Sequence, residues 1–108
     1  MQAIVLPVSD RFNEYGASVC ERLRAGGARV ELDDRSESVG RKIREAELRK
    51  VPYMLVVGER EAADGAVSVR EHRAGDEGSM PTEQFGERLQ GELYSSALKP
   101  RKSSERHP

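Results

Sequence analysis

The chain is 108 residues long, which suits a single domain able to bury roughly 60 to 70% of the surface exposed by its unfolded chain. Hydrophobic residues make up 36% and charged residues 34%, and every apolar run is far shorter than the ~18 to 20 residues needed to cross a bilayer, so no membrane-spanning helix is expected in this segment. The net charge of −1 excludes a general binder of DNA or other polyanions, so any nucleic-acid site must depend on a local concentration of cations.

A strand and then a helix are predicted at the N-terminus. Residues 3–8 are apolar and β-prone, and Ser9 and Asp10 supply N-cap oxygens for the helix that follows. The apolar positions of this helix recur at three- and four-residue spacing and end at a glycine pair: Phe12, Tyr15, Val19, Cys20, Leu23, Gly26 and Gly27. The first residues lack the basic flank and cleavage site of a signal peptide, so we expect a cytoplasmic protein.

Cys20 is the one cysteine of the chain, which excludes an internal disulfide and leaves too few thiols for a zinc knuckle. Its place on the apolar stripe predicts a packed core thiol, and no basic neighbour is evident that would make it a nucleophile. The sequence therefore gives no sign of cysteine-based catalysis or of a metal site.

The segment 41–50, RKIREAELRK, concentrates positive charge on a predicted helix. Its cations outnumber its glutamates and comprise Arg41, Lys42, Arg44, Arg49 and Lys50. One interpretation is a solvated face, because Glu45 can form surface ion pairs worth roughly 0.2 to 0.5 kcal/mol each. The other is a contact with the phosphates of a nucleic acid, and composition alone favours the solvated face.

Two predicted strands flank this basic helix. Residues 28–32 alternate in polarity as a strand, and Ser36 or Ser38 then caps the helix. The run VPYMLVV at residues 51–57 is nearly all apolar, which is typical of a strand covered on both faces. We therefore expect residues 51–57 to form the central strand.

A charged loop is predicted at residues 59–65, joining the central strand to an antiparallel neighbour at residues 66–70. On that neighbour the valines face one way and Arg70 the other, because side chains alternate along a strand. Residues 73–80 contain two glycines and are predicted to form a second loop.

The last predicted element is a helix that opens at Pro81 and packs through Phe85, Leu89 and Leu93. From residue 95 onward apolar content is too low for ordered packing, so residues 1–94 are the predicted domain and residues 95–108 a flexible tail. The alternation of strands and helices predicts an α/β domain of three layers.

Several motifs together resemble the C-terminal anticodon-binding domain of bacterial threonyl-tRNA synthetases. They are the pattern D-x-R-x-E-x-x-G-x-K-I-R-E on residues 33–45, the strand VPYMLVVG, the V-x-V-R element ending at Arg70, and G-S-M ending at Met80. The resemblance extends from about Gln2 to Leu93. It implies a five-stranded mixed sheet flanked by helices, the module shared by a subgroup of class II synthetases.

The resemblance also implies that the domain grips the anticodon loop of threonine tRNA, with Glu61 and Arg70 reading the middle guanine. A guanidinium can donate to guanine O6 and N7 while a carboxylate accepts from N1–H and N2–H, so the pair suits that base. From the residues alone, an exposed ion pair between Glu61 and Arg70, worth about 0 to 1 kcal/mol, is the simpler interpretation.

Ser36, Arg44 and Lys50 match neighbouring positions of the family and are expected to contact the adjacent base or the phosphates. Family members often have asparagine where this chain has Ser36, so the contact with the third anticodon base differs from the family pattern. His72 shares the strand face of Arg70 and is expected to be a solvated histidine rather than a stacking platform. Tyr53 and Phe85 fall on packed elements and are expected in the core.

The resemblance implies that this domain catalyses nothing alone and binds no cofactor or metal, because ATP and zinc belong to the catalytic domain of the parent synthetase. That catalytic domain is the second expected partner, beside the tRNA. The chain is expected to be a fragment of the ligase.

The alternative is a free-standing paralogue that acts as a protein-interaction or dimerisation module. A small phosphate-handling enzyme fits poorly, because Gly26-Gly27 precedes a strand and does not open a helix.

Overall fold

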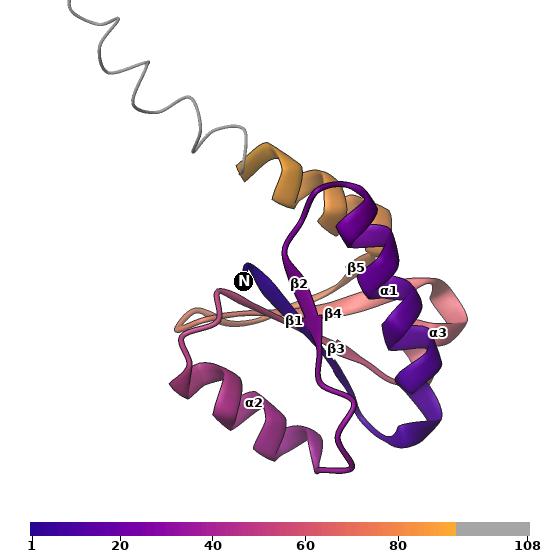
Figure 1. Ribbon diagram of the computed structural model, residues 1–108, viewed down its shortest axis with the longest axis vertical. Helices are drawn as coiled ribbons and strands as arrows, with labels where there is room; N and C mark the ends of the chain where they lie inside the picture. The colour runs from indigo at the N-terminus through magenta and orange to yellow at the C-terminus, as the bar shows by residue number, and fades with distance from the viewer. Residues whose placement is uncertain (93–108) are drawn as a thin grey trace, which may run out of the picture.

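The computed structural model of the chain describes residues 1–92. They form one five-stranded sheet in the order β2-β1-β3-β4-β5, with helices on both of its faces (Figure 1). The strands are β1 (Ala3–Pro7), β2 (Val30–Leu32), β3 (Tyr53–Val57), β4 (Ala66–Glu71) and β5 (Gly75–Pro81). The helices are the 3-10 turn η1 (Asp10–Phe12), α1 (Asn13–Ala25), α2 (Val39–Leu48), α3 (Glu59–Asp64) and a helix over residues 82–92.

The sheet is mixed. β1 pairs in parallel with β2 and with β3, whereas β3 with β4 and β4 with β5 are antiparallel. The expected fold class, a three-layer α/β domain with a five-stranded mixed sheet, is therefore confirmed. The central position falls to β3, which has β1 and β2 on one side and β4 and β5 on the other.

The larger apolar core lies between the sheet and the pair formed by α1 and the helix at residues 82–92 (Figure 1). Tyr53 and Phe85 meet there edge to face, with ring centroids 5.3 Å apart. Cys20 is buried in the same core, and burial raises the pKa of its thiol. The predictions that Tyr53, Phe85 and Cys20 are packed are therefore confirmed.

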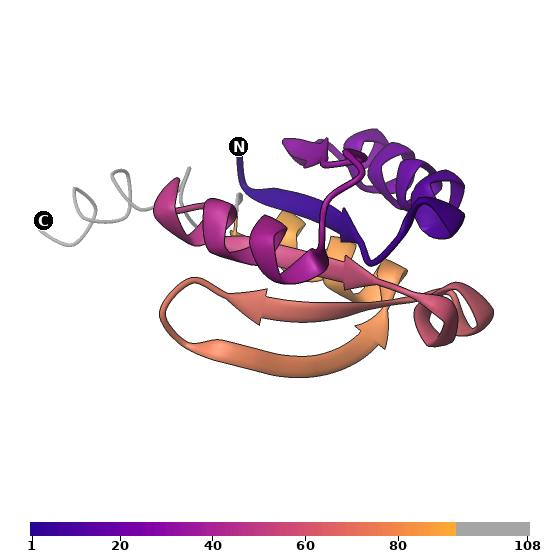
Figure 2. The same ribbon diagram turned by 90° about the horizontal axis from the view of Figure 1, so that it is seen from below.

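The smaller core lies under α2 on the opposite face. Ile4 and Leu6 of β1 and Met54 of β3 pack against Ala46 of α2 and Val51. α2 contacts β1 and β3, and Figure 2 shows the β4–β5 hairpin to one side of it. Half of this sheet face thus carries a helix, while the hairpin half is left without one among residues 1–92.

Two predicted loops are wrong. Residues 59–64 form α3, because Gly58 and Gly65 bound a short run of good helix formers and the Glu61 side chain accepts a hydrogen bond from the Gly58 N–H at 2.9 Å. Residues 75–81 form the edge strand β5, which obtains its backbone partners from β4 despite a polar and glycine-bearing sequence.

The start of the first helix also differs from the prediction. The 3-10 turn η1 precedes α1, and Phe12 belongs to neither apolar core, so its predicted place on the inward stripe is wrong. For the basic helix, Ser38 and not Ser36 is the N-cap, since its hydroxyl accepts from the Arg41 N–H at 3.2 Å. The predictions about Leu93 and the tail at residues 95–108 lie outside the described residues.

Candidate nucleic-acid interface

The carboxyl ends of β2, β1 and β3 lie along one edge of the sheet. The chain leaves β1 for α1 on one face and leaves β2 for α2 on the other (Figure 1). In open α/β sheets, ligands bind in the crevice where successive connections diverge in this way. Three segments meet this edge, namely residues 8–13, 33–38 and 58–61, and two of the predicted site residues, Ser36 and Glu61, lie on them.

Ser36 is exposed on the segment between β2 and α2, and its hydroxyl is already engaged. It donates to the Asp10 carboxylate, with distances of 3.0 and 3.2 Å to the two oxygens. One turn away, the Asn13 side-chain amide donates to the backbone oxygen of Asp34 at 3.4 Å. The segment that carries Ser36 is thus tied to η1 through Asp10 and to the start of α1 through Asn13.

Glu61 is half-buried on α3 and uses one of its carboxylate oxygens to cap the helix. Oε1 accepts from the Gly58 N–H at 2.9 Å, which fixes the position of the side chain. The Oε2 atom makes no hydrogen bond among residues 1–92. A carboxylate held in this way keeps acceptor capacity for a ligand at the carboxyl end of β3.

Arg70 lies on the hairpin half of the α2 face. It pairs in register with Met54 of the α2-side core, so its side chain is on that face and not with Val67 and Val69, as predicted. Its Nε atom is buried without any hydrogen-bond partner in the described part of the chain. An unsatisfied buried donor costs about 1 to 3 kcal/mol, and an incoming acceptor could reach this Nε only if the side chain moved.

The structure places Glu61 and Arg70 toward different ends of β4. The tight hairpin expected between them is replaced by α3, and Arg70 lies four residues along β4 from Ala66, about 14 Å at 3.4 Å per residue. No ion pair joins the two side chains within residues 1–92, so the simpler interpretation, a surface ion pair, is not observed.

The basic helix α2 uses most of its charges within the protein. Arg41 lies 3.2 Å from Glu45 and 3.6 Å from Glu37. Arg35, on the preceding segment, bonds Asp33 with two nitrogens and also pairs with Glu45. Hydrogen bonding to Arg35 lowers the pKa of both Asp33 and Glu45. Much of this basic segment is therefore an ion-paired surface, as composition suggests.

Two exposed cations of this segment remain without an ion-pair partner in the described structure, while the buried Lys42 bonds a backbone oxygen. They are Arg44, exposed in the middle of α2, and Lys50, exposed just after it. Both are predicted to contact RNA. Lys50 and Arg70 lie toward the amino end of β3, whereas Ser36 and Glu61 lie toward its carboxyl end, so the predicted residues extend along the sheet and do not form one cluster.

His72 follows β4 and lies beside α2, half-buried. Its Nδ1 is 2.7 Å from the Glu47 carboxylate but outside hydrogen-bonding geometry, so this buried nitrogen has no hydrogen bond within residues 1–92. The histidine expected to be solvated is thus only partly exposed, because Glu47 of α2 lies against the ring.

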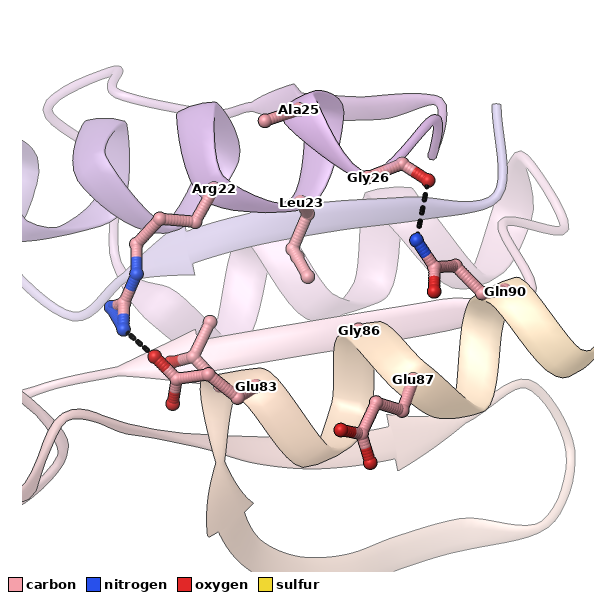
Figure 3. Close-up of a pocket in the computed structure, with 9 residues that line it drawn as sticks. Arg22, Leu23, Ala25, Gly26, Glu83, Gly86, Glu87 and Gln90 are labelled. Carbon is pink, nitrogen blue, oxygen red and sulfur yellow. Dashed lines mark hydrogen bonds and ion pairs between the residues drawn. The ribbon is translucent and has the colours of Figure 1, made fainter.

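A hollow of about 420 Å³ lies on the other side of the sheet, between α1 and the helix at residues 82–92 (Figure 3). Arg22 pairs with Glu83 at one end, and Gln90 donates to the backbone oxygen of Gly26 at 2.9 Å at the other. Leu23 lies between these bridges (Figure 3). Because both bridges join the two helices, this hollow is a helix-helix seam, and it contains none of the predicted site residues.

Comparisons with known proteins agree with this geometry. The family described as "Anticodon binding domain" matches residues 2–92. The chain belongs to that family. It is 50% identical over 93 residues to the threonine–tRNA ligase of Prosthecochloris aestuarii, covering 86% of this chain and 14% of that protein. The corresponding ligase of Bacteroides fragilis is 49% identical over 94 residues, covering 87% of this chain and 15% of that protein.

A solved structure supports the same assignment. The RNA binding domain of threonyl-tRNA synthetase from Cryptosporidium parvum superposes with a TM-score of 0.74 at 37% identity, covering 78% of this chain and 21% of that one. This anticodon-binding domain thus spans about one seventh of the length of the curated ligases that it matches. The alternative of a dimerisation module gains no support from these relatives.

Two residues of this anticodon-binding domain, Lys42 and Phe12, lie near the carboxyl end of β1 but were not predicted from sequence to lie there. Lys42 is only 1% exposed, and its Nζ donates to the backbone oxygen of Pro7 at 3.0 Å, directly before the β1–η1 connection. Phe12 lies one residue beyond Arg11, whose guanidinium is 5.0 Å from the ring centroid. A signal for Lys42 existed, because it falls three residues after Val39 on the inward face of α2.

No helix within residues 1–92 is long and apolar enough to cross a membrane. No group of three or more histidine, cysteine, aspartate or glutamate side chains among the same residues is arranged to hold a metal ion.

Proposed function

We propose that this anticodon-binding domain binds the anticodon loop of threonine tRNA and reads its unpaired bases, as part of a threonyl-tRNA synthetase. Support comes from the family match over residues 2–92 and from ligase relatives near 50% identity. The catalytic domain of the synthetase is its second partner, and amino-acid activation takes place there. The domain itself needs neither ATP nor zinc and acts in the cytoplasm.

The single observation that carries the base-reading role is the state of Arg70. Its guanidinium lies on the sheet face that α2 leaves open, and its buried Nε has no partner among residues 1–92. Folding leaves this donor desolvated, and a movement of the side chain that brought it to an acceptor on a bound base would relieve that cost.

Arg70 and Glu61 select the middle guanine of the anticodon. The guanidinium donates to O6 and N7, and the free oxygen of the Glu61 carboxylate accepts from N1–H or N2–H. The helix α3 lies between the two residues in the chain and sets them apart along the sheet. The guanine therefore lies over β4, with Arg70 on one side of it and Glu61 on the other. Adenine and the pyrimidines cannot satisfy both groups.

The remaining predicted residues flank this base. Ser36 contacts the third anticodon base through its hydroxyl oxygen, which keeps acceptor capacity while it donates to Asp10. Arg44 and Lys50, which have no ion-pair partner in the described part, contact phosphates. Phosphate contacts fix the register of the RNA, while base contacts give the specificity.

The test is a titration of the domain with a hairpin RNA carrying the threonine anticodon and with the same hairpin in which adenine replaces the middle guanine. The guanine hairpin should bind more tightly by about 5- to 150-fold, equivalent to about 1 to 3 kcal/mol for one bidentate contact. Equal affinity for the two hairpins would rule the proposal out.

An Arg70→Ala variant should remove most of that preference and weaken binding of the adenine hairpin far less. Arg29→Ala is the matched control, because Arg29 is exposed and has no ion-pair partner among residues 1–92 but lies beside β2, on the far side of the sheet from β4. The control should bind both hairpins almost as the parent domain does.

A further inference from the structure

Phe12 is exceptional among the aromatic residues at positions 1–92. Tyr53 and Phe85 are buried in the larger core, and Tyr15 packs against that core while its hydroxyl donates to the Ala66 oxygen at 2.7 Å. Phe12 alone belongs to neither core and keeps part of its surface exposed. Core packing therefore does not account for an aromatic ring at this position.

The ring of Phe12 has a cation beside it. The Arg11 guanidinium carbon lies 5.0 Å from the ring centroid, within cation–π range. Arg11 is exposed and has no ion pair within the described range. Next to the same turn, Val8 is 36% exposed at the end of β1. An aromatic ring, an unpaired guanidinium and an apolar side chain thus share this short stretch of backbone.

Hydrogen bonds hold the backbone around Phe12 beside Ser36. The Phe12 N–H closes the 3-10 turn on the Ser9 oxygen at 3.0 Å, and the preceding Asp10 accepts the Ser36 hydroxyl at 3.0 Å. The following residue, Asn13, bonds the backbone of Asp34, and its buried Oδ1 atom has no partner in the described structure. The residue that follows Phe12 therefore keeps an unsatisfied acceptor.

We propose that Arg11 and Phe12 form a stacking platform for an unpaired nucleobase next to the one that Ser36 contacts. Unstacked RNA bases bind on aromatic rings and on arginine guanidinium planes, and such stacking tolerates any base. The platform supplies affinity without selectivity, whereas Glu61 and Arg70 supply the selectivity. This inference rests on the proposed function, because it requires the domain to bind single-stranded RNA.

The variant Phe12→Leu tests the platform, because it keeps apolar bulk and removes the aromatic face. It should weaken binding of the threonine anticodon hairpin by about 5- to 150-fold, with the same factor for the hairpin that lacks the middle guanine. Phe12→Trp, which keeps a stacking face, should bind at least as tightly as the parent domain. Arg11→Met should weaken binding, and Arg29→Met is its control for loss of one charge.

A second readout reports stacking directly. 2-Aminopurine, whose fluorescence is quenched on stacking, is placed in turn at the third anticodon base and at the nucleotide after it. Addition of the parent domain should quench at least one of the two probes, and Phe12→Leu should abolish that quenching. Thermal melting of the variants should match the parent domain, because Phe12 lies outside both cores.

The outcomes separate the two proposals. If the parent domain binds the hairpin and Phe12→Leu binds it equally, the platform is refuted and the proposed function stands. Unchanged quenching in Phe12→Leu would refute the platform in the same way. If the parent domain binds no anticodon hairpin at any salt concentration, both proposals fail. A loss of affinity confined to one middle base would also refute the platform, because stacking is not base-selective.

Discussion

The ammonium group of Lys42 donates a hydrogen bond to the backbone oxygen of Pro7 at 3.0 Å, and the lysine is 1% exposed. A buried lysine is rare unless it is paired, because desolvation of the charge is costly. Here the hydrogen bond links α2 to the end of β1, immediately before the turn that carries Asp10 and Phe12.

Lys42→Met should therefore change the free energy of unfolding by less than about 2 kcal/mol, since the unsatisfied Pro7 oxygen is offset by removal of a buried charge. Lys42→Ala should cost about 2 to 4 kcal/mol, because it also leaves a cavity under α2. Urea unfolding of both variants measures the difference. Equal losses in the two variants would contradict this account of the lysine.

Lys50 occupies a backbone conformation that normally favours glycine. Its φ is 59°, and the α2 C-terminus closes with bonds from the Lys50 N–H to the Glu47 oxygen at 3.0 Å and from the Val51 N–H to the Ala46 oxygen at 3.1 Å. This is a Schellman motif with lysine at the position where glycine is usual, and the left-handed conformation costs a non-glycine residue roughly 1 to 2 kcal/mol.

Lys50→Gly should accordingly raise the free energy of unfolding by about 1 kcal/mol, whereas Lys50→Ala should leave it nearly unchanged. If Lys50 contacts a phosphate, both variants should bind the anticodon hairpin more weakly. If Lys50→Gly is more stable than the parent domain but binds the hairpin more weakly, the charge of Lys50 serves RNA binding at a cost in stability. Undiminished binding by both would remove Lys50 from the site.

Most of the fold could be predicted from sequence because the signals are local. The buried strand at residues 53–57 and the α1 and α2 patterns follow from hydrophobic spacing, and the position before α2 narrows the cap to Ser36 or Ser38. β5 could not be predicted in this way. Its side chains are mostly exposed, Gly75 and Gly78 have positive φ, and only pairing with β4 makes it a strand.

The arrangement of the predicted site residues could not be predicted from sequence, and their role in binding stays a prediction. The helical spacing of Phe12 with Tyr15 and Val19 fails because the 3-10 turn has three residues per turn, which displaces Phe12 from the stripe of α1. The distance between Glu61 and Arg70 depends on α3, whose helical state arises from caps at Gly58 and Gly65. The displacement of Phe12 and the distance between Glu61 and Arg70 both depend on tertiary structure, so residue spacing does not reveal them.

Glu61 has two roles that can be separated by substitution. Its Oε1 caps α3 through the Gly58 N–H, and we propose that the carboxylate charge reads guanine. Glu61→Gln keeps an acceptor oxygen and should change stability by less than about 0.5 kcal/mol, whereas Glu61→Ala should cost about 1 kcal/mol of capping. Both variants should lose preference for the guanine hairpin in the titration. Retained preference in Glu61→Gln would mean that the carboxylate charge is not used.

Arg44 can be tested through the salt dependence of binding. A cation that contacts a phosphate of single-stranded RNA contributes about 0.7 to the slope of log affinity against log salt concentration. Arg44→Gln should therefore flatten that slope by about this amount and weaken every hairpin equally. Arg41→Gln is the matched control, because Arg41 already pairs with Glu37 and Glu45, and its slope should change less. Equal changes of the slope in Arg44→Gln and Arg41→Gln would contradict the claim that the unpaired cation, and not the paired one, contacts a phosphate.

Asp33 should make the stability of the domain depend on pH in the acid range. The Arg35 side chain hydrogen-bonds Asp33 and holds the pKa of that carboxyl below its usual value. A group whose pKa is lower in the folded state stabilises the fold above its unfolded pKa, near 4, and loses that contribution as pH falls through the folded value. The free energy of unfolding should therefore decline as pH drops below about 4.

Asp33→Asn should show a shallower decline over the same interval, measured by urea unfolding at a series of pH values. Arg35→Met should flatten the profile more than Asp33→Asn does, because Arg35 also lowers the pKa of Glu45. The double variant should behave as Arg35→Met does, since the Asp33–Arg35 bond is already lost in that single variant. A steeper decline in either single variant would show that the Asp33–Arg35 bond does not stabilise the segment that holds Ser36 against η1.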